Sequence, residues 1–141
     1  MTRFRLPTGL ALATALLAVP AHSTDYAPAM QTFLDTQVRA WAEDPVIVAA
    51  ITAQNARTAD LAQSEIDALD QAWRAEVAGA ERPTISPVIR NAASDFLRAR
   101  VAEAGGMITE IFAVDARGLN VAASAVTSDY WQGDEEKFTE T

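Results

Sequence analysis

The chain has 141 residues, of which 50% are hydrophobic and 21% charged, so its composition is that of one globular domain. It contains no cysteine and a single histidine, His22, which excludes disulfides and cysteine-ligated metal sites and leaves little basis for histidine chemistry. The formal net charge of -8 argues against nucleic-acid binding, which needs clustered cations. We therefore expect no enzyme, no catalytic residues, no cofactor, no metal and no nucleic-acid partner.

The first residues have the pattern of an export signal. Arg3 and Arg5 precede an apolar run at residues 9–19, and Pro20 ends that run. The order of positive charge, apolar run and small residues is typical of a secretory signal peptide. The run is shorter than the roughly 20 residues that a membrane-spanning helix needs. We predict a signal peptide at residues 1–23.

Two cleavage points fit this signal, one after Ala21 and one after Ser23. Cleavage at either leaves 9 basic and 19 acidic residues, since the signal contains two arginines and no acidic residue. The mature protein is then expected to be periplasmic or secreted, without a transmembrane anchor. The alternatives are an N-terminal core helix or an uncleaved anchor.

Helical periodicity begins soon after this segment. Apolar residues from Met30 to Trp41 fall on one helical face, and Asp44 followed by Pro45 is typical of the start of a second helix. The polar stretch at residues 54–62 indicates a frayed continuation of that helix or a connector. Trp41 is expected to be a core residue.

Two further helices are expected. Ser64 is the predicted N-cap of a helix that ends near Gly79, and Trp73 on its apolar stripe is expected in the core. Ser86 is the predicted N-cap of one helix that begins at Pro87 and runs to residue 101. Gly105 and Gly106 follow it and should stop it.

The pattern then changes to β-structure. Residues 107–114 and 119–123 are predicted strands, joined by a turn from Asp115 to Gly118. Helices followed by an antiparallel hairpin make an α+β fold. A lone hairpin is marginally stable. Three solutions remain open: helices cover it, another chain completes the sheet, or the domain is truncated.

The hairpin sequence Ile-Thr-Glu-Ile-Phe-Ala-Val-Asp-Ala-Arg-Gly-Leu-Asn-Val-Ala-Ala-Ser at residues 108–124 resembles the first hairpin of extracytoplasmic PAS-like sensor domains, the Cache or PDC family. The continuation Asp-Tyr-Trp-Gln-Gly-Asp-Glu at residues 129–135 resembles the segment that follows it. The resemblance implies a single sensor domain over residues 24–141, without the C-terminal strands of the family. It also implies signal transduction through a small-molecule ligand, an organic acid or an amino acid, bound between the sheet and the segment after the second strand.

Five residues are the candidate ligand-binding set. Tyr130 and Trp131 would form an apolar wall with polar groups, and Asp129 or Asp134 would supply a charge or a hydrogen bond. Arg100, beside the apolar stripe of its helix, would bind a carboxylate through its guanidinium group.

Structural interpretations stand beside these roles. Trp131 could pack on the sheet, and Asp129 could cap a short helix that runs through Asp134. Arg100 could pair with a surface acid such as Glu103. The acidic run after Gly133 is more typical of a solvated face than of a calcium loop.

The sequence thus favours a non-enzymatic, extracytoplasmic small-molecule-binding sensor module. Its expected partners are the ligand and either a membrane-bound signalling protein or a second copy of the chain. The alternatives are an interaction protein that docks through its helices and an open sheet edge, or a truncated sensor fragment.

Overall fold

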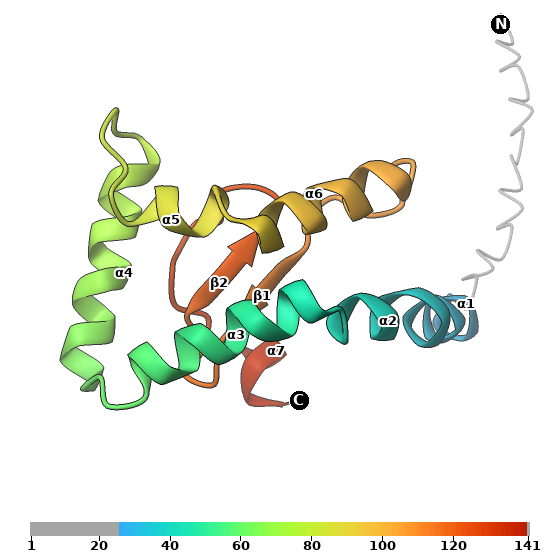
Figure 1. Cartoon of the computed structure of the whole chain (residues 1–141), viewed down its shortest axis with the longest axis horizontal. Coiled ribbons are helices and arrows are strands. Elements are labelled where there is room, and N and C mark those ends of the chain that lie inside the picture. Colours follow the sequence, from blue (N-terminus) through green and yellow to red (C-terminus); the bar gives the residue numbers. More distant parts are fainter. Residues whose placement is uncertain (1–25, 141) are drawn as a thin grey trace, which may run out of the picture.

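The computed structural model describes residues 26–140, and the predicted signal peptide lies outside these residues. The fold is α+β, with helices first and a two-stranded antiparallel sheet after them, as the sequence predicted (Figure 1). Between residues 26 and 140 no helix combines the length and apolarity that crossing a membrane requires. In chain order the elements are α1 (Ala27–Phe33), the π-helix η1 (Leu34–Val38), α2 (Arg39–Ala42), α3 (Pro45–Thr58), α4 (Gln63–Val77), α5 (Ile85–Ile89), α6 (Ala92–Glu103), β1 (Phe112–Val114), β2 (Asn120–Ala123) and α7 (Glu136–Thr139).

Strand β2 lies at the centre of the fold. Helix α3 packs along one side of the hairpin, and α5 and α6 lie along the other side (Figure 1). All four residues of β2 are buried, whereas the three residues of β1 are half-buried. The helices therefore cover β2, which is the first of the three solutions that the sequence left open.

The hairpin is shorter than the sequence predicted. β1 begins at Phe112, because the N–H of Ile111 donates to the Ser124 hydroxyl at 3.0 Å rather than to a backbone carbonyl. The turn has the predicted form: the Gly118 N–H donates to the Asp115 carbonyl at 3.0 Å, and Gly118 has a φ of 80°. Leu119 lies before β2: its carbonyl accepts the Asp115 N–H at 2.9 Å, and it forms a separate bridge with Trp131.

The start of α3 is confirmed. The Asp44 carboxylate accepts the N–H of Val46 at 2.9 Å, and Pro45 occupies the first helical position. The polar stretch at residues 54–62 is divided: α3 continues through it to Thr58, and residues 59–62 connect α3 to α4. Two residues of the stretch, Gln54 and Thr58, are buried.

Two predicted helix starts are wrong. Helix α4 begins at Gln63, so Ser64 lies inside it, because the Glu65 carboxylate accepts the Ala62 N–H at 2.8 Å and caps the helix there. The single helix predicted to begin at Pro87 is two helices, α5 and α6, and α5 already begins at Ile85, so Ser86 is not its N-cap. Asn91 adopts an extended conformation, and its side-chain oxygen accepts the Ser94 N–H at 2.8 Å, which starts α6 afresh.

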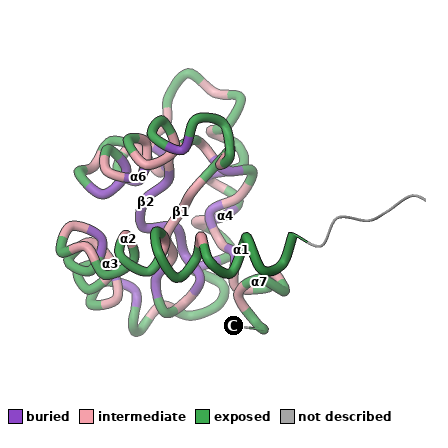
Figure 2. The backbone as a smooth tube through the Cα atoms, turned by 90° about the vertical axis from the view of Figure 1, so that its right-hand side faces the viewer, coloured by how far each residue is buried: buried purple, intermediate pink, exposed green. Residues whose placement is uncertain are grey.

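Two clusters of buried side chains form the core. One surrounds Trp73, which is fully buried as predicted, and the other lies between α3 and α6 around Ile47 and Leu97. Trp41 is only half-buried, so its predicted core position is wrong. It lies on the arm of α1, η1 and α2, which extends beyond the core and is mostly exposed (Figure 2), and its ring contacts Phe33 edge-on at 5.9 Å.

Candidate functional site

A cleft with a volume of about 610 Å³ lies between α3 and the segment that carries α5 and α6. Its volume is within the range of small-molecule sites, about 300 to 1,000 Å³. Val121 of β2 and Tyr130 form part of its lining. The other lining residues are Val46, Ala50, Ala53, Gln54, Arg57, Thr58, Leu69, Pro83, Thr84, Pro87, Val88, Asn91, Ala92 and Ala93.

Tyr130 is held rigidly at this cleft. Its ring stacks on Trp73, with centroids 5.3 Å apart and planes 15° apart, and the Trp73 indole N–H donates to the Thr127 carbonyl at 2.9 Å. Burial raises the pKa of the Tyr130 phenol, and the charge of Asp115 raises it further, against the opposing effects of Arg57 and Gln54. The phenol is therefore a neutral hydrogen-bonding group near Arg57.

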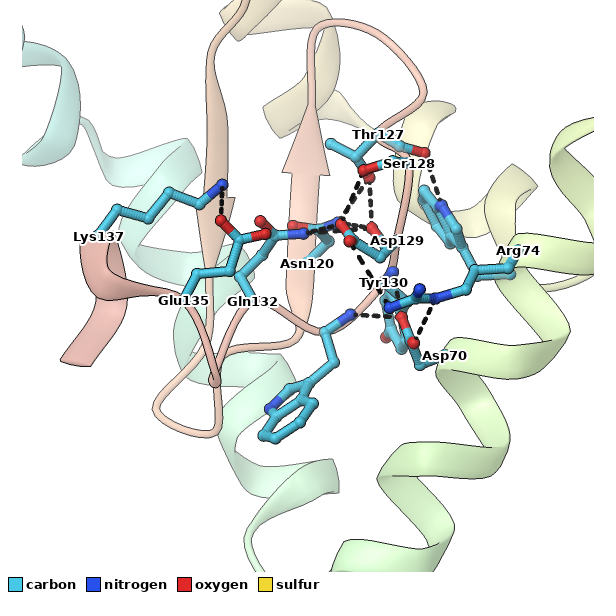
Figure 3. Close-up of polar contacts among 12 residues, drawn as sticks. Asp70, Arg74, Asn120, Thr127, Ser128, Asp129, Tyr130, Gln132, Glu135 and Lys137 are labelled. Atoms are coloured by element: carbon cyan, nitrogen blue, oxygen red, sulfur yellow. Dashed lines mark hydrogen bonds and ion pairs between the residues drawn. The ribbon is translucent and has the colours of Figure 1, made fainter.

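The backbone at Tyr130 is fixed by a carboxylate on another element. One oxygen of Asp70 in α4 accepts the N–H groups of Tyr130 at 2.8 Å and Trp131 at 3.1 Å (Figure 3). The other oxygen accepts the Arg74 Nε–H at 2.7 Å. On the far side, the Tyr130 carbonyl accepts the N–H of Asn120 in β2 at 3.0 Å. The phenol is thus positioned from both the helix layer and the sheet.

The α3 side of the cleft is fixed by the hairpin turn. Thr58 donates its hydroxyl to Asp115 at 2.8 Å, and the Gln54 amide donates to the same carboxylate oxygen at 3.1 Å. The other oxygen of Asp115 accepts the N–H groups of Arg117 at 2.8 Å and Leu119 at 3.0 Å. Asp115 is buried with both oxygens occupied, so it is not available to a ligand.

Arg57 is the one charged residue among those that line the cleft. It is exposed, next to Thr58 in the chain and about one turn after Gln54. The opposite wall offers Asn91, but its amide already donates to the carbonyls of Pro87, Val88 and Val121. The cleft therefore combines an exposed cation with neutral polar groups and an apolar lining, an arrangement suited to a small organic anion.

Of the five sequence-predicted ligand residues, the structure places Tyr130 in this cleft. Trp131 is half-buried, and its indole N–H donates to the Arg117 carbonyl at 2.8 Å. Asp134 is exposed. Arg100 lines a different cleft of about 410 Å³, between the arm and the end of α6, and pairs with Glu103 at 3.0 Å.

Asp129 supports the segment around Tyr130 rather than lining the cleft. Its carboxylate accepts the Gln132 amide N–H at 2.5 Å, and it lies 3.7 Å from Arg74 (Figure 3). It does not cap a helix, because the nearest helix, α7, has Glu135 as its N-cap. The interpretation of Asp129 as a cap is therefore wrong.

The α3 residues of the cleft were not predicted from the sequence. Ile47, Ile51, Gln54 and Thr58 share one helical face, since their spacings are four, three and four residues. Two polar residues continuing an apolar stripe would have indicated a buried polar contact. Arg57 gave no such signal, because an arginine next to that face is ordinary for a surface helix.

Metal binding has no support in the described part of the chain: residues 26–140 contain no group of three or more His, Cys, Asp or Glu side chains placed to hold an ion. No protein-family model, no curated protein and no solved structure matches the chain. The resemblance to Cache or PDC sensors thus depends on the quoted residues alone.

Proposed function

We propose that the protein is an extracytoplasmic, non-enzymatic module that binds a small organic anion in the cleft between α3 and α5–α6. The single observation that carries this proposal is the placement of Arg57 as the one charged side chain of a lining otherwise made of apolar and neutral polar groups. An arginine binds a carboxylate through charge-assisted hydrogen bonds. The Tyr130 phenol, a neutral hydrogen-bonding group in the lining, would add specificity.

The lining also narrows the ligand class. An amino acid needs a partner for its ammonium group, and the lining residues include no carboxylate. Asp115, buried beneath the cleft, has both oxygens occupied by four donors. Of the two classes expected from the sequence, an organic acid with a short apolar body therefore fits better than an amino acid.

Three related molecules test this proposal by thermal unfolding and titration calorimetry. Isovalerate has the carboxylate and an apolar body, isovaleramide lacks the charge, and valine adds an ammonium group. We expect isovalerate to raise the melting temperature in a saturable way, as a ligand of the native state must. Isovaleramide and valine should do so less.

A pair of variants assigns the binding to the cleft. Arg57→Gln removes the cation and should weaken isovalerate binding about tenfold or more. Arg90→Gln removes the same charge from an exposed residue that does not line the cleft, so it should leave binding unchanged. Equal affinities for the two variants, or no response of the native protein to isovalerate, would overturn the proposal.

Export is part of the same proposal. Expression of all 141 residues in a bacterial host with a secretion pathway, followed by intact-mass measurement, should show a chain that begins at residue 22 or 24. A product that keeps Met1 and stays in the cytoplasm would contradict the extracytoplasmic assignment. Docking through the sheet edge has less support, since Lys137 lies over the Phe112 ring at 5.0 Å, and a charge beside an edge strand disfavours strand addition.

A further inference from the structure

The arm of α1, η1 and α2 carries an apolar surface that the described chain does not bury. No residue of these three helices is buried. An apolar groove of about 780 Å³ lies between the arm and the loop after α6. Tyr26, Met30, Leu34 and Met107 line it with exposed fractions of 67%, 63%, 44% and 77%. Such a concentration of exposed apolar side chains is typical of an interaction surface.

The geometry of the arm keeps these residues on one side. Tyr26, Met30, Leu34 and Val38 are spaced four residues apart, and in a regular α-helix that spacing rotates the stripe by about 40° at each step. The π-helix η1 spans Leu34–Val38 and has more residues per turn, which counters this rotation. All four residues line the same groove as a result.

The distribution of charge over the chain indicates which partner can cover the apolar groove. The residues that line the groove include no charged side chain. The charged residues of the arm are Asp35 and Arg39. They pair with each other at 2.8 Å, and their charges sum to zero. The whole chain has a net charge of -8, so two copies repel each other over most of their surfaces. The arm is a surface on which two copies can meet without bringing carboxylates together.

We propose that two copies of this chain associate through the arm, with the apolar groove of one facing the groove of the other across a two-fold axis. A two-fold interface requires one patch to supply both the protruding groups and the hollow that receives them. The apolar surface around the groove supplies both. Met107, Tyr26 and Met30 are its most exposed side chains and can protrude into the partner, and the groove that they line can receive the same side chains of the partner. The arm is about 24 Å long, which is enough for a helix-pair contact. This inference is independent of ligand binding in the other cleft.

The test measures molar mass over a concentration series, by light scattering and sedimentation, on protein expressed from the complete gene. The native protein should be in monomer–dimer equilibrium. Met30→Glu and Leu34→Glu each place two carboxylates in the dimer contact and should raise its dissociation constant at least about 30-fold. The control is Val48→Glu, the same type of change at an apolar residue of α3 that is 47% exposed and outside the groove.

Circular dichroism melts separate loss of association from loss of folding. Since Met30 and Leu34 are exposed in the single chain, both variants should keep the native helical signal. A native protein that stays monomeric over the whole series overturns the proposal. So does a dimer that both arm variants leave intact, because the contact would then lie elsewhere. Equal dissociation by Val48→Glu would likewise show that the groove is not the contact.

Discussion

The carboxylate of Asp70 accepts the backbone N–H of Tyr130 at 2.8 Å, across 60 residues of chain. This bond joins α4 to the segment after β2, and the same oxygen also holds the N–H of Trp131 (Figure 3). Tyr130 reaches the cleft because α4 fixes the backbone on which it stands. The position of the phenol is therefore set by a helix that comes much earlier in the chain.

Replacing Asp70 should destabilise the fold more than replacing its ion-pair partner. Asp70→Ala leaves the N–H groups of Tyr130 and Trp131 without their acceptor, and we expect a loss of about 2 to 4 kcal/mol in the free energy of unfolding. Arg74→Ala removes a half-exposed guanidinium that pairs with Asp70 and lies 3.7 Å from Asp129, and it should lower the free energy of unfolding by about 1 kcal/mol. Urea denaturation measures both values. Equal losses would contradict the assigned role of Asp70.

Gly118 should tolerate no side chain. A Cβ at this position would lie 2.7 Å from both the Cα and the N of Gly133, and the φ of Gly118 is 80°. Gly118→Ala should therefore lower the free energy of unfolding by about 2 to 4 kcal/mol, because backbone strain and steric overlap act together. Gly105 also has positive φ, at 58°, but a Cβ there would have no atom within 4 Å, so Gly105→Ala should cost only about 1 kcal/mol. The difference between the two midpoints in chemical denaturation isolates the contact with Gly133.

Asp115 should be among the most sensitive polar positions. Asp115→Ala removes the acceptor of the Arg117 and Leu119 N–H groups, and we expect a loss of about 2 to 4 kcal/mol in the free energy of unfolding. Gln54 and Thr58 also lose a bond to Asp115 but keep backbone carbonyls as acceptors. Asp115→Asn keeps one acceptor oxygen but places the asparagine NH2 group against donors. Its loss in the free energy of unfolding should therefore lie between those of Asp115→Ala and the native protein. Asp134→Ala, at an exposed carboxylate, should change stability by less than about 0.5 kcal/mol. Thermal melts should rank the variants in this order, and an Asp115→Ala protein as stable as Asp134→Ala would contradict it.

Stability should fall at alkaline pH through Tyr130. Its folded-state pKa is raised above the ordinary value of 10.0, chiefly by burial. The unfolded chain therefore loses this proton at a lower pH than the folded chain, so the stabilising contribution is full below pH 10 and is lost as pH rises toward the folded-state pKa. Denaturation curves from neutral to strongly alkaline pH should show this loss in the native protein and in Tyr26→Phe. Tyr130→Phe should lack this component, and an unchanged alkaline profile in Tyr130→Phe would show that another group is responsible.

The order of elements follows from local sequence. Asp44 with Pro45 starts α3, Gly105 and Gly106 follow the end of α6, and the Asp115–Gly118 turn sets the hairpin. Each of these signals depends on neighbouring residues, so a single sequence is sufficient to read it. The break between α5 and α6 was missed because Asn91 was not recognised as an N-cap, although its side-chain oxygen accepts the Ser94 N–H within the same segment.

The residues of the cleft could be predicted from the sequence only in part. From the sequence, Tyr130 could be selected as an aromatic residue beside the sheet, and it does line the cleft. Arg100 could be selected equally well, yet it lines another cleft, because nothing local encodes which end of α6 faces α3. Arg57 enters the cleft through the packing of α3 against the hairpin. That packing depends on contacts such as Gln54 to Asp115, which are 61 residues apart.

The sequence by itself therefore determined the α+β class, the element order, the turn and the absence of cysteine chemistry, since composition, caps and periodicity are local properties. Only the tertiary structure decided that β2 is enclosed by α3, α5 and α6, that Trp41 lies outside the core, and that Arg57 and Tyr130 share a cleft. These facts depend on the pairing of buried carboxylates such as Asp115 and Asp70 with distant donors. Such pairings are chosen by the free energy of the whole packed chain, which no short stretch of sequence specifies.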